Sequence, residues 1–215
     1  NPDAIEDVTL HKGAYPAEFG GRLGSVVNIR QRQESPGAIR PRAAVGLLAS
    51  RAMVEGPVRG GSWMISFRRS TMEPVLAELN ARDVAGTPES FHFYDINGSL
   101  HARLSQRDRL SLMVYSGFDE MRFPFASNML FDVAYGNQAA SARWTHVAGS
   151  RMYANITAAA SRYASNSKAL LSRMPFQRQS RIRDVSLEGD LDFVPNERHT
   201  LTAGARLGYL GFGLD

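Results

Sequence analysis

Apolar and polar residues alternate along much of the chain, and a period of two predicts β-strands. In the segment 185–193, Leu187 and Leu191 fall on one strand face, whereas Glu188 and Asp190 fall on the other. A strand can present one apolar and one wet face in this way, but a helix would mix the two sets. The same alternation predicts about nine strands, at roughly 38–46, 49–55, 62–69, 94–104, 109–117, 136–147, 151–163, 185–193 and 201–209.

The connections between these strands alternate in length. Short turns are predicted at 56–61, 105–108, 148–150 and 195–198, and longer polar stretches at 70–90, 118–135 and 164–178. The stretch TMEPVLAELNARDVA has helical composition at its centre and predicts a short helix within the first long loop. Long strands joined by alternating short turns and long loops are typical of an outer-membrane β-barrel, with its turns in the periplasm and its loops outside.

A soluble β-sandwich is the alternative, because its strands alternate as well. Sandwich strands usually run about five or six residues, and here one face carries acids and arginines deep into long strands. A water-filled or plugged lumen accommodates that face, as would the outer face of a sandwich. Trp63, Trp144 and Phe193 fall on the apolar face close to short turns, where a barrel has its periplasmic aromatic belt.

Composition narrows the classes of function. The 215 residues carry a net charge of +4, with basic residues spread along the chain between acids. A nucleic-acid face would need clustered positive charge, so no nucleic-acid partner is expected. The absence of cysteine excludes disulfides and thiolate metal sites. There is no run of 18 apolar residues for a transmembrane helix, and the first ten residues do not resemble a signal peptide.

The opening segment NPDAIEDVTLHKGAYPAEFGGRLGSVVNIRQRQ carries a family resemblance. A short strand at 5–10 and a closing apolar strand at 25–29 flank a glycine-rich turn. This order resembles the end of the plug domain of TonB-dependent outer-membrane receptors, in the Bacteroidetes-type branch where the plug runs directly into the first barrel strands. The matching plug-motif residues are Lys12, Gly13, Tyr15, Gly20, Gly21 and Arg22.

The resemblance implies an all-β fold: a partial antiparallel transmembrane β-barrel of about eight or nine strands, with the C-terminal piece of a plug. Residues 1–35 would be the plug end and 36–215 the first part of the barrel, so the chain is expected to be a fragment. The implied function is uptake of a scarce solute (iron chelate, cobalamin, glycan or peptide) by energy-coupled plug movement in a Gram-negative outer membrane. Implied partners are outer-membrane lipid, the periplasmic protein TonB, a small solute and a surface lipoprotein. A small structural or adhesive barrel, complete in itself, is the alternative.

The residues predict no enzyme, cofactor or metal site. The five histidines are scattered, and no nucleophile motif or phosphate loop is present. In TonB-dependent receptors, the family that the opening segment resembles, plug arginines pair with acids of the barrel. The resemblance therefore implies a contact between Arg22 or Arg30 and the acids on one face of the strand at 185–193. The competing expectation pairs Glu188 with Arg206, diagonally across the last hairpin. The acids concerned are Glu188, Asp190 and Asp192.

A barrel fixes which side chains should be exposed. The sequence predicts a curved antiparallel meander with the N-terminal segment against its concave side and lipid on the other. Predicted to point toward lipid are Leu187, Leu191, Leu201, Ala203, Leu207, Ile96 and Leu100. Predicted to face the inside are Glu188, Asp190, Asp192, Asn97 and Arg206.

Overall fold

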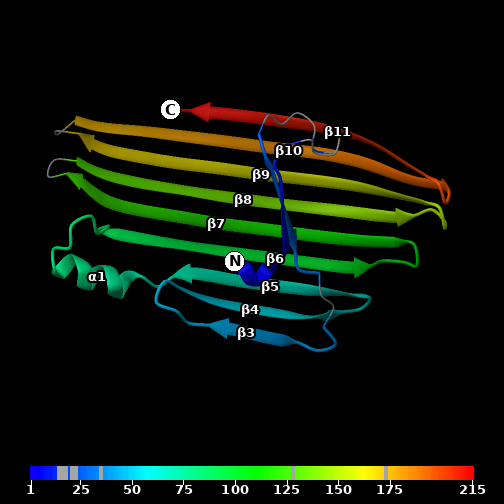
Figure 1. The fold of residues 1–215 in the computed structure, drawn as a ribbon, viewed down its shortest axis with the longest axis horizontal. Helices are drawn as coiled ribbons and strands as arrows, with labels where there is room; N and C mark the ends of the chain where they lie inside the picture. Colours follow the sequence, from blue (N-terminus) through cyan, green and yellow to red (C-terminus); the bar gives the residue numbers. More distant parts are fainter. Residues whose placement is uncertain (14–18, 20–23, 34–35, 127–128, 172–173) are drawn as a thin grey trace.

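The computed structural model describes residues 1–13, 19, 24–33, 36–126, 129–171 and 174–215. Its main feature is a nine-stranded antiparallel sheet in which each strand pairs with the next in sequence (Figure 1). This meander leaves β3 and β11 at the two ends of the strand order, so the described sheet is open. Its strands are β3 (Arg40–Ala44), β4 (Ala49–Val58), β5 (Gly61–Ser70), β6 (Ser90–Arg103), β7 (Asp108–Ala126), β8 (Met129–Val147), β9 (Met152–Leu171), β10 (Met174–Asn196) and β11 (His199–Leu214).

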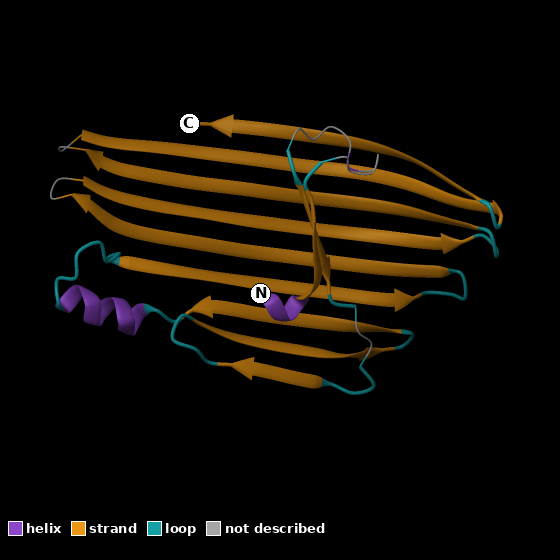
Figure 2. Cartoon of the chain, in the orientation of Figure 1, coloured by secondary structure: helices purple, strands orange, loops and turns teal. Residues whose placement is uncertain are grey.

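The N-terminal segment forms a separate unit on one face of this sheet. A 3-10 turn, η1 (Pro2–Ala4), leads into β1 (Ile5–His11), which pairs antiparallel with β2 (Val26–Gln31). This hairpin runs across the strands of the large sheet rather than along them (Figure 2). The face that carries the hairpin is called the inner face below, and the opposite one the outer face.

The short turns and the loop helix are confirmed. Strands β4 and β5 are separated by only residues 59 and 60, and the other three predicted turns also separate neighbouring strands. The first turn needs glycine, because Gly60 has φ +76° and a Cβ on Gly61 would lie 1.8 Å from the carbonyl oxygen of His101. Helix α1 (Glu73–Ala81) lies within the predicted loop at 70–90, with Pro74 in its first turn.

Two predicted loops were wrong. Most of 118–135 and 164–178 belongs to strands, because β7 pairs with β8 as far as Ala126 and Met129, and β9 with β10 as far as Leu171 and Met174. Their polar residues were interpreted as loop signals. The polar residues of these stretches that the structure describes have cross-strand partners. Backbone pairing with neighbours on both sides sustains a strand whose side chains are hydrophilic on both faces.

The distribution of buried residues is the reverse of that in a water-soluble sandwich. The buried hydrophobic residues in the described chain are only Ala4, Met53, Met64 and Leu76, and no face-packed pair of sheets encloses an apolar core. The inner face instead buries polar side chains from β4, β5 and β6. They are Glu55, Ser62, Ser66, Ser70, Asp95, Asn97 and Ser99.

The exposure predictions are largely confirmed. Asn97 is buried on the inner face, where Glu188, Asp190 and Asp192 are half-buried and Arg206 is exposed beside Asp184. Leu100 is half-buried rather than exposed, since it lies between Trp63 of β5 and Leu112 of β7. The remaining predicted outward residues are exposed: Leu187, Leu191, Leu201, Ala203, Leu207 and Ile96.

Candidate functional site

The N-terminal turn is attached to the inner face by an ion pair, a buried methyl group and two contacts of Asn1. The Asn1 side-chain amide donates to the carbonyl oxygen of Phe67 at 3.4 Å, and its amino nitrogen lies 3.4 Å from Asp95. The carboxylate of Asp3 forms an ion pair with the guanidinium of Arg51 of β4, with Nε and Oδ2 3.0 Å apart. Ala4 is 1% exposed and packs in a cluster with Met53 and Met64. The turn that presents both residues is capped by Asn1, whose side chain accepts from the backbone N–H of Asp3. Residues 1, 3 and 4 therefore form the anchor between the hairpin unit and the sheet.

Beside the anchor, the inner face holds two largely buried carboxylates. Asp95 of β6 accepts from Arg68 at 2.6 Å and from the Asn97 amide at 3.1 Å. Glu55 of β4, only 2% exposed, accepts from Arg42 of β3 at 3.1 Å. Buried carboxylates are tolerated when a cation and hydrogen bonds compensate their lost hydration. These pairs make the inner face polar and ordered at the place where the hairpin docks.

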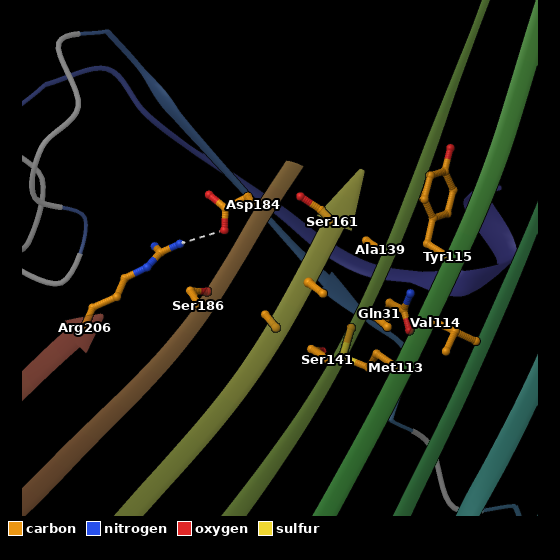
Figure 3. A pocket seen from close by; sticks show the side chains of 13 residues that line it. Gln31, Met113, Val114, Tyr115, Ala139, Ser141, Ser161, Asp184, Ser186 and Arg206 are labelled. Atoms are coloured by element: carbon orange, nitrogen blue, oxygen red, sulfur yellow. Dashed lines mark ion pairs between the residues drawn. The ribbon is translucent and has the colours of Figure 1, made fainter. Parts of the chain in front are cut away.

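A cavity of about 380 Å³ lies on the inner face beneath the end of β2 (Figure 3). Gln31 of the hairpin lies over it, and the Asp184–Arg206 pair, 3.8 Å apart, lies at the far side. Its floor consists mainly of short side chains from β8, β9 and β10, which leave space between hairpin and sheet. They include Ala139, Ser141, Ala159, Ser161 and Ser186.

The plug-motif residues lie only partly within the described chain. Lys12 and Gly13 follow β1 and are exposed. Tyr15, Gly20, Gly21 and Arg22 lie outside the described residues, so the geometry of the predicted glycine turn is not part of the structure's description. The flanking strands at 5–10 and 25–29 do form the two arms of the β1–β2 hairpin.

Arg30 pairs within the hairpin and not with the barrel acids. Its guanidinium donates to Asp7 of β1 at 3.1 Å, and the two residues are direct cross-strand partners. A hydrogen bond from Thr9, followed by the one from Arg30, lowers the pKa of the Asp7 carboxyl. The expected contact of Arg30 with the 188–192 acids is therefore replaced by a local one.

Of the three β10 acids expected to meet the plug, Asp190 and Asp192 accept hydrogen bonds from neighbouring strands. Asp190 accepts from Asn155 of β9 at 2.5 Å, and Asp192 accepts from Thr202 of β11 at 2.5 Å. Glu188 lies directly opposite Arg206 in the ladder, not diagonally as expected, and the ion pair of Arg206 is with Asp184. Asp190 and Asp192 thus belong to cross-strand networks of the sheet itself.

Sequence reasoning missed the anchor at Asp3 and Arg51. The sequence around each residue has no unusual pattern of polar and apolar positions. The two residues are 48 positions apart, so no spacing rule connects them. The one available signal was the alternation in β4, which puts Arg51, Met53 and Glu55 on a single face.

The described part of the chain meets neither the requirements of a metal site nor those of a membrane-spanning helix. It holds no group of three or more His, Asp or Glu residues that could bind a metal ion. No helix among the described residues is long and apolar enough to cross a membrane. No family model and no curated protein matches the sequence. The family resemblance therefore rests on the sequence motifs given above.

Proposed function

We propose that the chain is part of an outer-membrane receptor that takes up a scarce solute by energy-coupled movement of the N-terminal unit. The observation that carries this proposal is an apolar band on the outer face opposite a polar inner face. At the short-turn end, the band begins at Met152, Phe193 and Leu201, and it ends near Val185 and Tyr209. Every residue between these limits on the outer face of β10 and β11 is apolar or glycine.

The height of the band fits a bilayer. Phe193 and Val185 are eight residue steps apart, which is about 26 Å along a strand and about 20 Å across the membrane at a strand tilt of about 40°. Outer-membrane barrels carry an outward apolar band of about 25 Å. In water, so large an exposed apolar face would be an aggregation surface, whereas lipid is its natural solvent.

The anchor suits a unit that has to move. Side chains of Arg51 and Asp3 retain 42% and 22% exposure, so water screens their attraction and the pair contributes about 1 kcal/mol or less. Apart from η1, the hairpin forms few contacts with the sheet, and a cavity separates Gln31 from the floor. A periplasmic partner of the TonB type could therefore displace the unit without breaking the sheet. Lipid around the band, a small solute and a surface lipoprotein complete the proposed set of partners.

Locking the anchor should stop uptake. This chain has no cysteine of its own, so a short bifunctional methanethiosulfonate cross-linker can join Asp3→Cys to Arg51→Cys within it. The experiment uses the full-length protein in cells, with any cysteine outside this chain replaced by serine. We expect growth on the dependent iron or glycan source to fall to the level of a deletion strain and to recover when reductant removes the linker. A screen of defined iron and glycan sources with the deletion strain identifies that source first.

The matched control joins Asp7→Cys and Arg30→Cys, which are partners within the hairpin, and should leave uptake unchanged. Uptake that persists while positions 3 and 51 remain cross-linked would refute movement of the N-terminal unit. Recovery of the protein from the outer membrane with no solute-dependent growth phenotype would favour the structural or adhesive barrel instead.

Charge reversal tests the anchor itself. Asp3→Arg places a cation against Arg51, and we expect the N-terminal turn to detach, because attraction is replaced by repulsion. Arg51→Asp should do the same, and the double reversal should restore docking. Spin labels at Leu10→Cys and Ser161→Cys would report this as a broadened distance distribution in the single variants only. Arg30→Gln, the control, removes a charge from the hairpin without setting two like charges opposite each other and should leave the distribution narrow; if it alone detaches the hairpin, the anchor has been misassigned.

A further inference from the structure

Just beyond the apolar band, the outer face becomes strongly basic. The two cross-strand rows next to Val185 contain Arg162 of β9 and Arg181 and Arg183 of β10. All three arginines are exposed. The described residues of these two rows, from β6 to β11, include no carboxylate. The rows are Ile96, Ser116, Gln138, Arg162, Arg183 and Gly211, and Tyr94, Phe118, Gly136, Ala164, Arg181 and Gly213.

Two of these arginines face each other without compensation. Arg162 and Arg183 are direct cross-strand partners, and like charges in that position are destabilising. The inner face shows how the chain resolves the same problem elsewhere. Arg51 and Arg68 are also direct partners, and Asp3 and Asp95 neutralise one each. Neither Arg162 nor Arg183 has an acidic partner among the described residues, so an external anion is the remaining means of neutralising them.

The basic rows border a hollow that can hold more than an ion. A cavity of about 510 Å³ lies on the outer face and is lined by Arg162 and Arg181 together with Tyr94, Phe118 and Gln138. The rings of Tyr94 and Phe118 are in contact, with centroids 5.8 Å apart. Aromatic rings beside arginines at the end of an apolar band are suited to the boundary between acyl chains and headgroups.

We propose that this basic patch, comprising Arg162, Arg181 and Arg183, binds the phosphate groups of an anionic glycolipid in the leaflet next to helix α1. Guanidinium groups bind phosphate oxygens through two parallel hydrogen bonds, and the adjacent band accepts the acyl chains. The inference rests on the proposed membrane location. It does not depend on solute uptake or on movement of the hairpin.

The test compares lipids in nanodiscs that contain the full-length protein to which this chain belongs. The discs are made of phosphatidylcholine alone or with phosphatidylglycerol or bisphosphorylated lipid A, and native mass spectrometry counts the lipids retained by the protein. We expect lipid A to be retained most, because its two phosphates can meet several arginines together. Arg162→Gln with Arg183→Gln should reduce its retention about 10-fold or more, since hydrogen bonds to charged groups are lost.

The matched control is Arg178→Gln. Arg178 is an exposed arginine of the same strand, but it lies on the inner face, so lipid A retention should stay at the wild-type level. The pair Arg162→Lys and Arg183→Lys keeps the charge and should give an intermediate loss, which separates phosphate binding from misfolding. Equal retention of lipid A and phosphatidylglycerol, or wild-type retention by the double Gln variant, would overturn the basic-patch proposal and leave the membrane location standing. Failure of the full-length protein to enter any disc would overturn both.

Discussion

Leu187→Arg is expected to lower the free energy of unfolding in a lipid bilayer by about 2–3 kcal/mol. Leu187 lies inside the apolar band, and an arginine at the middle of a barrel's lipid face costs about 2–4 kcal/mol, less toward the interface. In a water-soluble sheet the result would differ. Leu187 is 50% exposed, and a polar replacement at such a surface position changes stability by about 0.5 kcal/mol or less. Urea unfolding in vesicles of neutral lipid, followed by tryptophan fluorescence, measures the difference.

The control is the same substitution on the opposite face at the same depth. Thr157 of β9 lies on the inner face, directly across from Glu188, and accepts a hydrogen bond from Arg143. Thr157→Arg loses that hydrogen bond and places a cation directly between Glu188 and Arg143. The attraction to Glu188 and the repulsion from Arg143 offset each other, so the expected change stays within about 1 kcal/mol. Equal effects at the two positions would mean that lipid does not cover the outer face, and the membrane proposal would fail.

The sequence predicted the sheet well because strand alternation is a local property. Leu187 and Glu188 reveal their two faces within a few residues, and turns such as Gly60–Gly61 are set by backbone conformations that few other residues adopt. The limits of the strands were less predictable. Residues 118–135 are polar enough for a loop, yet the β7–β8 ladder continues as far as Ala126 and Met129. The composition of one segment does not reveal whether that segment pairs with a neighbouring strand, so it could not predict where these strands end.

The contacts of the candidate site could not be predicted from any single segment of the sequence. Arg30 was expected to contact the β10 acids, but hairpin register places it against Asp7, only 23 positions away. Asp3 and Arg51 meet because β1–β2 crosses the sheet, and that crossing angle comes from packing, not from a motif. The basic patch is likewise visible only once register aligns Arg162 with Arg183. The candidate sites therefore become visible only when residues are compared along cross-strand rows of the sheet.

The buried pair of Glu55 and Arg42 should give an unequal response to loss of each partner. Arg42→Met would leave the Glu55 carboxylate at 2% exposure without its cation, and breaking a buried pair in this way costs about 3–5 kcal/mol. Glu55→Gln should cost far less, about 1 kcal/mol. The Arg42 side chain is 41% exposed and can extend into water, whereas Glu55 has no comparable route. Urea unfolding of each variant in the same vesicles measures these changes.

The double variant Arg42→Met with Glu55→Gln should recover most of the loss, because the uncompensated charge is gone. Arg40 is the control: it lies directly opposite Glu55 in the β3–β4 ladder but makes no ion pair in the described structure, so Arg40→Met should change stability by about 0.5 kcal/mol or less. If Arg40 moves to pair with Glu55 when Arg42 is removed, Arg42→Met should lower the free energy of unfolding by less. Adding Arg40→Met to Arg42→Met should then restore the full decrease. Equal losses for Arg42→Met and Glu55→Gln would show that water reaches Glu55. The inner face beside the anchor would then be wet, and its carboxylates could not hold β3 to the sheet through a desolvated contact.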